Sequence, residues 1–135
     1  MRFRNRTCLL ACLLALGLLP AGCAKKAGNA GPASRGAAPL GEIYEMVSDY
    51  VKSHGKAPAG VDSLKQSQPI YPAGFQALKS GECVVVWGAK PDKAGSAVLA
   101  YEKDAPQKGG AVLLSNGKVK AMTAQEFEAA KKGSG

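Results

Sequence analysis

The sequence has little of the residue types on which metal proteins depend. Its 135 residues include one histidine, His54, and beyond residue 23 one cysteine, Cys83. A structural zinc site needs four Cys or His ligands, which this inventory cannot supply. Asp92, Glu102 and Asp104 lack the spacing of a calcium loop. The sequence therefore predicts no metal site and no cofactor.

The same scarcity bears on covalent catalysis. A thiol nucleophile needs a neighbouring base, and the only pair available is Cys83 with His54. Cys83 lies in the most hydrophobic of the expected strands, where a free thiol acts as a small apolar residue. His54 ends a helical pattern, where a cation stabilises the last carbonyl groups. We predict no catalytic residue and no enzymatic activity.

The basic excess is concentrated near the amino terminus. The formal net charge is +8, but three arginines lie in the first six residues, followed by Lys25, Lys26 and Arg35. From Pro39 onward, 12 lysines face 10 acidic residues. No basic cluster with interleaved aromatic residues occurs there, so we predict no nucleic-acid partner. Lys25 and Lys26 are compatible with lipid head groups or with a simple solvated linker.

The first 22 residues have the three parts of an export signal. Arg2, Arg4 and Arg6 form a positive region, and the apolar block Cys8–Leu19 follows. A membrane-spanning helix needs about 20 apolar residues, so this block is short for a permanent anchor. The pattern predicts a targeting segment.

Small residues, Ala21 and Gly22, precede Cys23 directly after the apolar block. This arrangement resembles the signal of a bacterial lipoprotein. The resemblance implies removal of residues 1–22 and lipid on Cys23, which would hold the protein on a membrane of the cell envelope, facing the periplasm or the exterior. Ala24 after the cysteine favours the outer membrane over the inner one. Ordinary signal-peptidase cleavage nearby and an uncleaved anchor are the alternatives.

Composition divides the rest of the chain into three parts. Residues 23–39 are rich in Ala, Gly, Pro and Ser and contain no large apolar side chain, which predicts a flexible tether after the lipidated residue. Residues 40–132 carry the periodic apolar patterns of one small domain. Residues 133–135 are expected to form a disordered tail.

The amino-terminal part of this domain predicts one strong helix. Apolar residues recur every three or four positions over residues 40–54, and Gly55 can take the positive φ of a helix end. Residues 55–81 contain several prolines and glycines and are expected to be largely irregular. Two short turns are predicted there, one capped by Asp62 and one over residues 74–78 with Phe75 and Leu78 inward.

The carboxy-terminal part predicts strands. Asn116-Gly117 is the preferred pair for a type I′ turn and predicts a hairpin. Thr123 and Glu126 match a capping box, which predicts a short helix to about residue 132 with Phe127 and Ala130 inward. The expected strands are 82–87, 97–102, 111–114 and 119–122.

This order of elements indicates the α+β class. We predict one N-terminal helix packed on a three- to four-stranded antiparallel sheet, with a short C-terminal helix.

Two segments resemble the soluble part of type IV pilin-like, or prepilin-like, proteins. These are the helix exit Gly55-Lys56-Ala57-Pro58 and the hairpin of residues 112–120 with the following Met122–Phe127. The resemblance covers roughly residues 40–130 and implies a fold with no assigned activity. The chain departs from the family at Asn116 and Pro106, which replace an aspartate and a histidine, and a lipoprotein signal stands in place of the long prepilin helix.

These observations predict a lipid-anchored cell-envelope protein. Its small pilin-like domain would be non-catalytic and would serve protein interaction or scaffolding. The partners expected are the membrane, through lipid on Cys23, and other envelope proteins. The alternative is a periplasmic module for a small ligand or glycan, in which Trp87, Tyr71 and Tyr101 would line an apolar groove.

Overall fold

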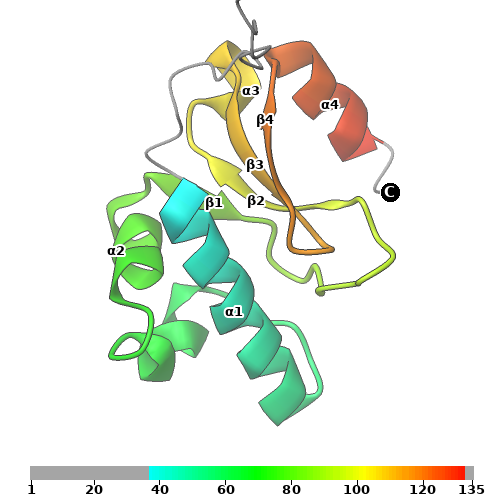
Figure 1. The fold of residues 1–135 in the computed structure, drawn as a ribbon. Helices are drawn as coiled ribbons and strands as arrows, with labels where there is room; N and C mark the ends of the chain where they lie inside the picture. Colours follow the sequence, from blue (N-terminus) through cyan, green and yellow to red (C-terminus); the bar gives the residue numbers. More distant parts are fainter. Residues whose placement is uncertain (1–36, 133–135) are drawn as a thin grey trace, which may run out of the picture.

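The computed structural model describes residues 37–132. The predicted signal peptide, Cys23 with the tether to residue 36, and the tail of residues 133–135 lie outside the described residues. The described part has the predicted α+β architecture (Figure 1). A four-stranded antiparallel sheet has α1 and α2 on one side and α4 on the other.

Helix α1, Ala37–His54, matches the predicted helix but begins three residues earlier. Pro39 lies in its first turn, where a missing backbone N–H leaves no hydrogen bond unmade. Gly55 follows with φ 69°, and its N–H donates to the carbonyl of Val51 at 2.8 Å. The buried face of α1 includes Met46, which is fully buried.

The prediction that residues 55–81 are largely irregular was wrong. They form a 3-10 helix η1, Val61–Ser67, and an α-helix α2, Pro72–Ser80. Pro72 stands at the start of α2, where its fixed φ suits the first helical position, and Gly81 ends the helix with φ 75°. Prolines therefore begin a helix here and do not interrupt one. Phe75 and Leu78 are buried, as predicted.

Asp62 does not have the predicted capping role. Gly60 occupies the position before η1, and no side chain caps that end of the helix. Asp62 lies inside the first turn of η1, and its carboxylate is 2.8 Å from the ammonium of Lys65. Both side chains are well exposed, so this ion pair adds little to stability.

The sheet is a simple meander, with strand order β1-β2-β3-β4 and every neighbouring pair antiparallel. Strand β1 is shorter than the predicted residues 82–87. A short helix, α3, Ala105–Lys108, connects β2 to β3 and was not predicted. Helix α4, Ala124–Lys132, ends the described chain. The strand bounds are Cys83–Val85 for β1, Val98–Glu102 for β2, Gly110–Leu114 for β3 and Val119–Met122 for β4.

Successive side chains of β3 contribute to the core on opposite faces of the sheet. Ala111 and Leu113 belong to the larger cluster with α1 and α2, whereas Val112 and Leu114 belong to a smaller cluster with Phe127 of α4. Successive side chains of a strand point to opposite faces, so a central strand covered on both sides is apolar throughout. This explains the continuous burial of Ala111–Leu114.

The predicted hairpin is confirmed, but its turn type was wrong. The N–H of Gly117 donates to the carbonyl of Leu114 at 2.9 Å, so Ser115 and Asn116 are the central residues of the turn. Gly117 follows with φ 84°, and the N–H of Leu114 donates to the carbonyl of Lys118 at 2.9 Å. This is a three-residue loop, which needs a left-handed residue only at its last position.

The predicted capping box at the start of α4 is confirmed. The Thr123 N–H donates to Oε2 of Glu126 at 2.8 Å, and the Glu126 N–H donates to Oγ1 of Thr123 at 3.2 Å. Phe127 is buried and Ala130 is half-buried against the smaller cluster, as expected. Hydrogen bonds from the backbone N–H and the hydroxyl of Thr123 hold the pKa of Glu126 below its usual value.

Candidate functional site

Cys83, the thiol considered as a nucleophile, lies on β1 and is only 4% exposed. Burial raises the pKa of this thiol to about 11, with further contributions from the carboxylates of Glu102 and Glu82. A thiol with this pKa is protonated at neutral pH, whereas the thiolate is the reactive form. The expectation that Cys83 is buried among apolar residues is confirmed.

His54 lies at the last position of α1 and is exposed. Its ring stacks on Tyr50 with centroids 4.1 Å apart, and its Nδ1 atom is 3.1 Å from the carbonyl oxygen of Tyr50. Both contacts are within its own helix. Figure 1 shows this end of α1 pointing away from β1, so the fold does not bring His54 to Cys83.

The three aromatic residues of the predicted groove are separated. Tyr71 packs against the larger core cluster, while Tyr101 meets Phe127 edge-on in the smaller cluster, with ring centroids 4.7 Å apart. The two clusters lie on opposite faces of the sheet, and Trp87 follows the end of β1 with 38% of its surface exposed. The alternative in which these residues line one groove is therefore not supported, and Tyr71 and Tyr101 are half-buried against the core.

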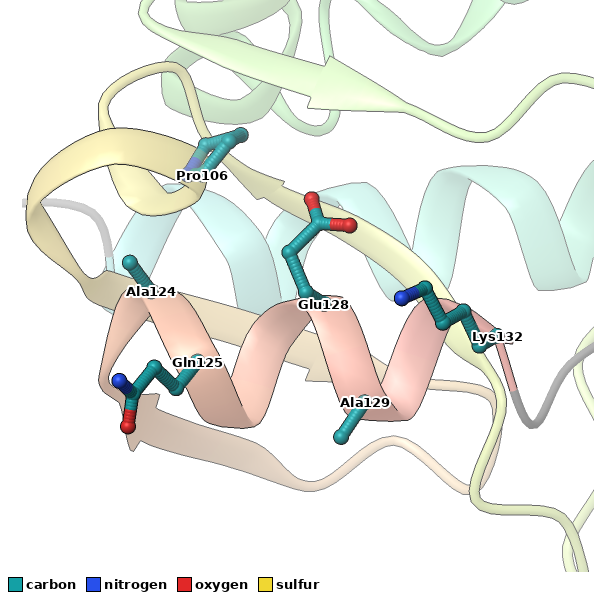
Figure 2. A pocket seen from close by; sticks show the side chains of 6 residues that line it. All are labelled: Pro106, Ala124, Gln125, Glu128, Ala129 and Lys132. Carbon is teal, nitrogen blue, oxygen red and sulfur yellow. The ribbon is translucent and has the colours of Figure 1, made fainter.

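A shallow depression lies between α3 and α4. Figure 2 shows Pro106 of α3 on the same side as Glu128 of α4, whereas Gln125 and Ala129 point away from it. Specific ligand sites enclose the ligand and aim several polar groups at it. The side chains of this depression are mostly exposed and do not converge, so it has no recognisable ligand chemistry.

Helix α2 is capped by a residue distant in sequence. Tyr71 precedes α2 and offers no side-chain cap, but Oε2 of Glu42, on α1, accepts the Gly74 N–H at 2.6 Å. An anionic acceptor at a helix start satisfies a free N–H and complements the helix dipole. A Cβ atom at Gly74 would lie 2.8 Å from Cβ of Glu42, so the glycine allows the two helices to approach. This contact was missed from the sequence.

A second polar contact joins the same elements. The Tyr71 hydroxyl donates to Oδ2 of Asp49 at 2.9 Å. This hydrogen bond, together with that from Lys52, lowers the pKa of Asp49, and the same carboxylate raises the pKa of Tyr71. Glu42 and Asp49 are thus both engaged in holding α1 to the α2 region, a structural role.

One end of the sheet combines exposed apolar and basic side chains. It consists of residues 86–97, which join β1 to β2, and residues 115–118, the turn between β3 and β4; we call this end the basic apex. The Asp92 N–H donates to the Ser115 carbonyl at 2.8 Å, and the Ser115 N–H donates to the Ala97 carbonyl at 2.7 Å. These bonds hold the two segments together.

Close packing reinforces this junction. A Cβ atom at Gly95 would collide with Oγ of Ser115, so a larger residue here would require the side chains of the junction to move. Oδ1 of Asp92 accepts the Ala94 N–H at 3.0 Å, which fixes the bend of the loop. In the sequence, turn-forming residues cluster on either side of the strands and indicate two turns. They do not reveal that the two turns contact each other.

The basic apex exposes Val86 and Trp87, at 36% and 38%, together with Lys90, Lys93 and Lys118. None of these lysines forms an ion pair with another of the residues 37–132.

In the part of the chain that the structure describes, no three His, Cys, Asp or Glu side chains come together as metal ligands. Its helices are also too short or too polar to cross a bilayer.

Comparison with known proteins gives no relative: no family model, no curated protein and no solved structure matches this chain.

Proposed function

We propose that this protein is a lipid-anchored protein of the bacterial cell envelope whose domain, residues 40–132, serves protein interaction. The proposal rests on the first 23 residues, in which a basic region is followed by a short apolar block and by small residues that end at Cys23. In this proposal Cys23 is diacylated, and two acyl chains hold a protein stably on a membrane. Location at the outer membrane is part of the proposal.

The chemistry of the domain supports a non-catalytic role. The one cysteine of the domain is a buried thiol with a raised pKa, and the one histidine contacts a carbonyl of its own helix. The carboxylates of Glu42 and Asp49 are occupied by contacts between helices. We further propose that the domain is pilin-like and presents its surface to other envelope proteins.

Metabolic labelling with radioactive palmitate tests the anchor. Cells producing the wild-type chain should incorporate the label into it, and cells producing Cys23→Ser should not. Cys83→Ser is the matched control, because it removes the other retained thiol and should leave labelling unchanged. Equal labelling of the wild-type and Cys23→Ser chains would reject the lipid assignment.

Affinity purification from crosslinked membranes tests the interaction role. The wild-type chain should return the same envelope protein in independent preparations. The Cys23→Ser chain, which lacks the anchor, should return less of that protein. Repeated purification without any common partner would count against an interaction module.

A further inference from the structure

We propose that the basic apex docks on an anionic phospholipid surface, so that the anchored domain lies on the membrane with this end down. The proposal rests on the anchoring proposed above, since lipid on Cys23 would place the domain next to a bilayer. It adds which face of the domain meets the lipid and which residues are responsible.

The distribution of charge selects this face. From Pro39 onward the chain carries a net charge of +2. The basic apex contains three lysines, Lys90, Lys93 and Lys118, and one carboxylate, Asp92, whereas the rest of residues 39–135 holds nine lysines and nine carboxylates. The residues of the basic apex alone therefore account for this net charge of +2. A phosphate-bearing surface is complementary to it.

The apolar side chains of the apex suit the same surface. Trp87 and Val86 are two of the three large hydrophobic residues exposed in the described part of the chain, and the third, Ile70, lies outside the apex. Tryptophan is enriched at the level of lipid head groups because its ring is apolar and its N–H remains hydrated. An exposed tryptophan and three exposed lysines at the same end of the sheet thus offer both shallow insertion and electrostatic attraction.

The apex is preformed. The hydrogen bonds between Asp92 and Ser115 and between Ser115 and Ala97 fix the long loop on the hairpin turn. The lysines of both segments are consequently held on one end of the sheet, which reduces the entropy lost when they meet a surface. Figure 1 shows this loop and turn together, at the end of the sheet opposite α3.

The length of the chain before α1 permits this orientation. Thirteen residues separate Cys23 from Ala37. At about 3.4 Å for each extended residue they can span up to roughly 45 Å. A domain of this size has a radius of gyration of about 12–13 Å and hence a width of roughly 30 Å. Since any face can reach the bilayer, the charge distribution and not the tether decides which face does.

The single tryptophan of the chain provides the test. The mature protein is reconstituted into vesicles of phosphatidylcholine, or of phosphatidylcholine with phosphatidylglycerol, each containing bromine-labelled lipid that quenches tryptophan at short range. We expect Trp87 emission to shift to the blue and to be quenched in the anionic vesicles, and to remain that of a water-exposed ring in the neutral ones. High salt should reverse the quenching.

Lysine variants separate docking from other causes of quenching. Each lysine near an anionic surface strengthens binding about fivefold, so Lys90→Gln, Lys93→Gln and Lys118→Gln together should weaken docking on the order of 100-fold. The matched control is Lys56→Gln with Lys79→Gln and Lys103→Gln, which removes the same charge from exposed positions elsewhere and should leave most of the quenching intact.

Any of the following outcomes would overturn the proposal. Trp87 could remain unquenched in anionic vesicles, quenching could be equal in neutral vesicles, or both triple variants could behave alike. A blue shift that depends on protein density and occurs without lipid quenching would indicate contact between two copies and would also overturn it. The mass of the amino terminus is measured on the same sample, so that a chain without acyl groups counts against the anchor separately from the quenching result.

Discussion

The two faces of the sheet differ in how much core they bury. On the α1 and α2 side, 14 buried residues form one cluster, and four α1 residues of that cluster are fully inaccessible to solvent. On the α3 and α4 side, the cluster has only five buried residues, Phe127 among them. Hydrophobic stabilisation follows the apolar area buried, so most of the folding free energy should come from the α1 face. The α4 face should open more easily, through local unfolding of its helix.

The largest effect is expected from truncating the α1 face. Ile43 is fully buried, and Ile43→Ala should lower the free energy of unfolding by about 3–4 kcal/mol, because it removes buried methyl groups and leaves a cavity. Urea unfolding of the purified chain measures this. Ile70→Ala makes the same change at a residue that is 70% exposed and should be nearly neutral. Equal effects of the two variants would contradict the assignment of the core to α1.

The contact between α1 and α2 should be the next most sensitive. A Cβ atom at Gly74 would lie 2.8 Å from Cβ of Glu42 and 3.1 Å from the Ile43 nitrogen, so Gly74→Ala must move one helix. We expect a loss of about 1–3 kcal/mol in thermal or urea unfolding.

Gly41→Ala is the matched control for this variant. It places a methyl group on α1 with no atom within 4 Å and should stabilise the protein by about 0.5–1 kcal/mol. The two alanines should therefore shift stability in opposite directions. A gain from Gly74→Ala would show that the helices are not closely packed there.

A smaller and local effect is expected on the α4 face. Thr123→Ala removes a capping side chain that accepts the Glu126 N–H and should cost about 1 kcal/mol. Hydrogen exchange should accelerate in α4 while the amides of α1 remain protected. Exchange that increases equally in both helices would indicate that the two faces unfold as one unit.

The smallest effect concerns pH. The pKa of Asp49 lies below its ordinary value of 3.8 because it accepts from Tyr71, so the stability from this bond is present above that pH and is lost as pH falls through the folded value. The pKa of Tyr71 lies above 10.0, so the same stability is lost as pH rises through its folded value. Tyr71→Phe should lower Tm slightly between the folded pKa of Asp49 and the folded pKa of Tyr71. It should leave Tm unchanged below the first value and above the second. A Tm difference independent of pH would exclude the hydrogen bond as its source.

Local signals predicted much of this fold. The periodicity of α1, the hairpin around Asn116-Gly117 and the capping box at Thr123 each depend on residues within a few positions of one another. The structure retains all three, with the turn type corrected. The α+β order followed from them.

Other features depend on contacts between residues distant in sequence. Helix α2 begins at a proline and receives its cap from Glu42, more than thirty residues away, so the glycines and prolines around it indicated only irregular structure. The meeting of residues 86–97 with the hairpin turn likewise depends on backbone hydrogen bonds that no local pattern contains. The basic apex could not be predicted, because it exists only once these two turns lie together.

Mass spectrometry of the mature amino terminus, purified from fractionated membranes, tests the central claim most directly. The account predicts a chain in the outer-membrane fraction that begins at Cys23 and carries the mass of a diacylglyceryl group on this residue. A chain that begins elsewhere, or an unmodified Cys23, would contradict it.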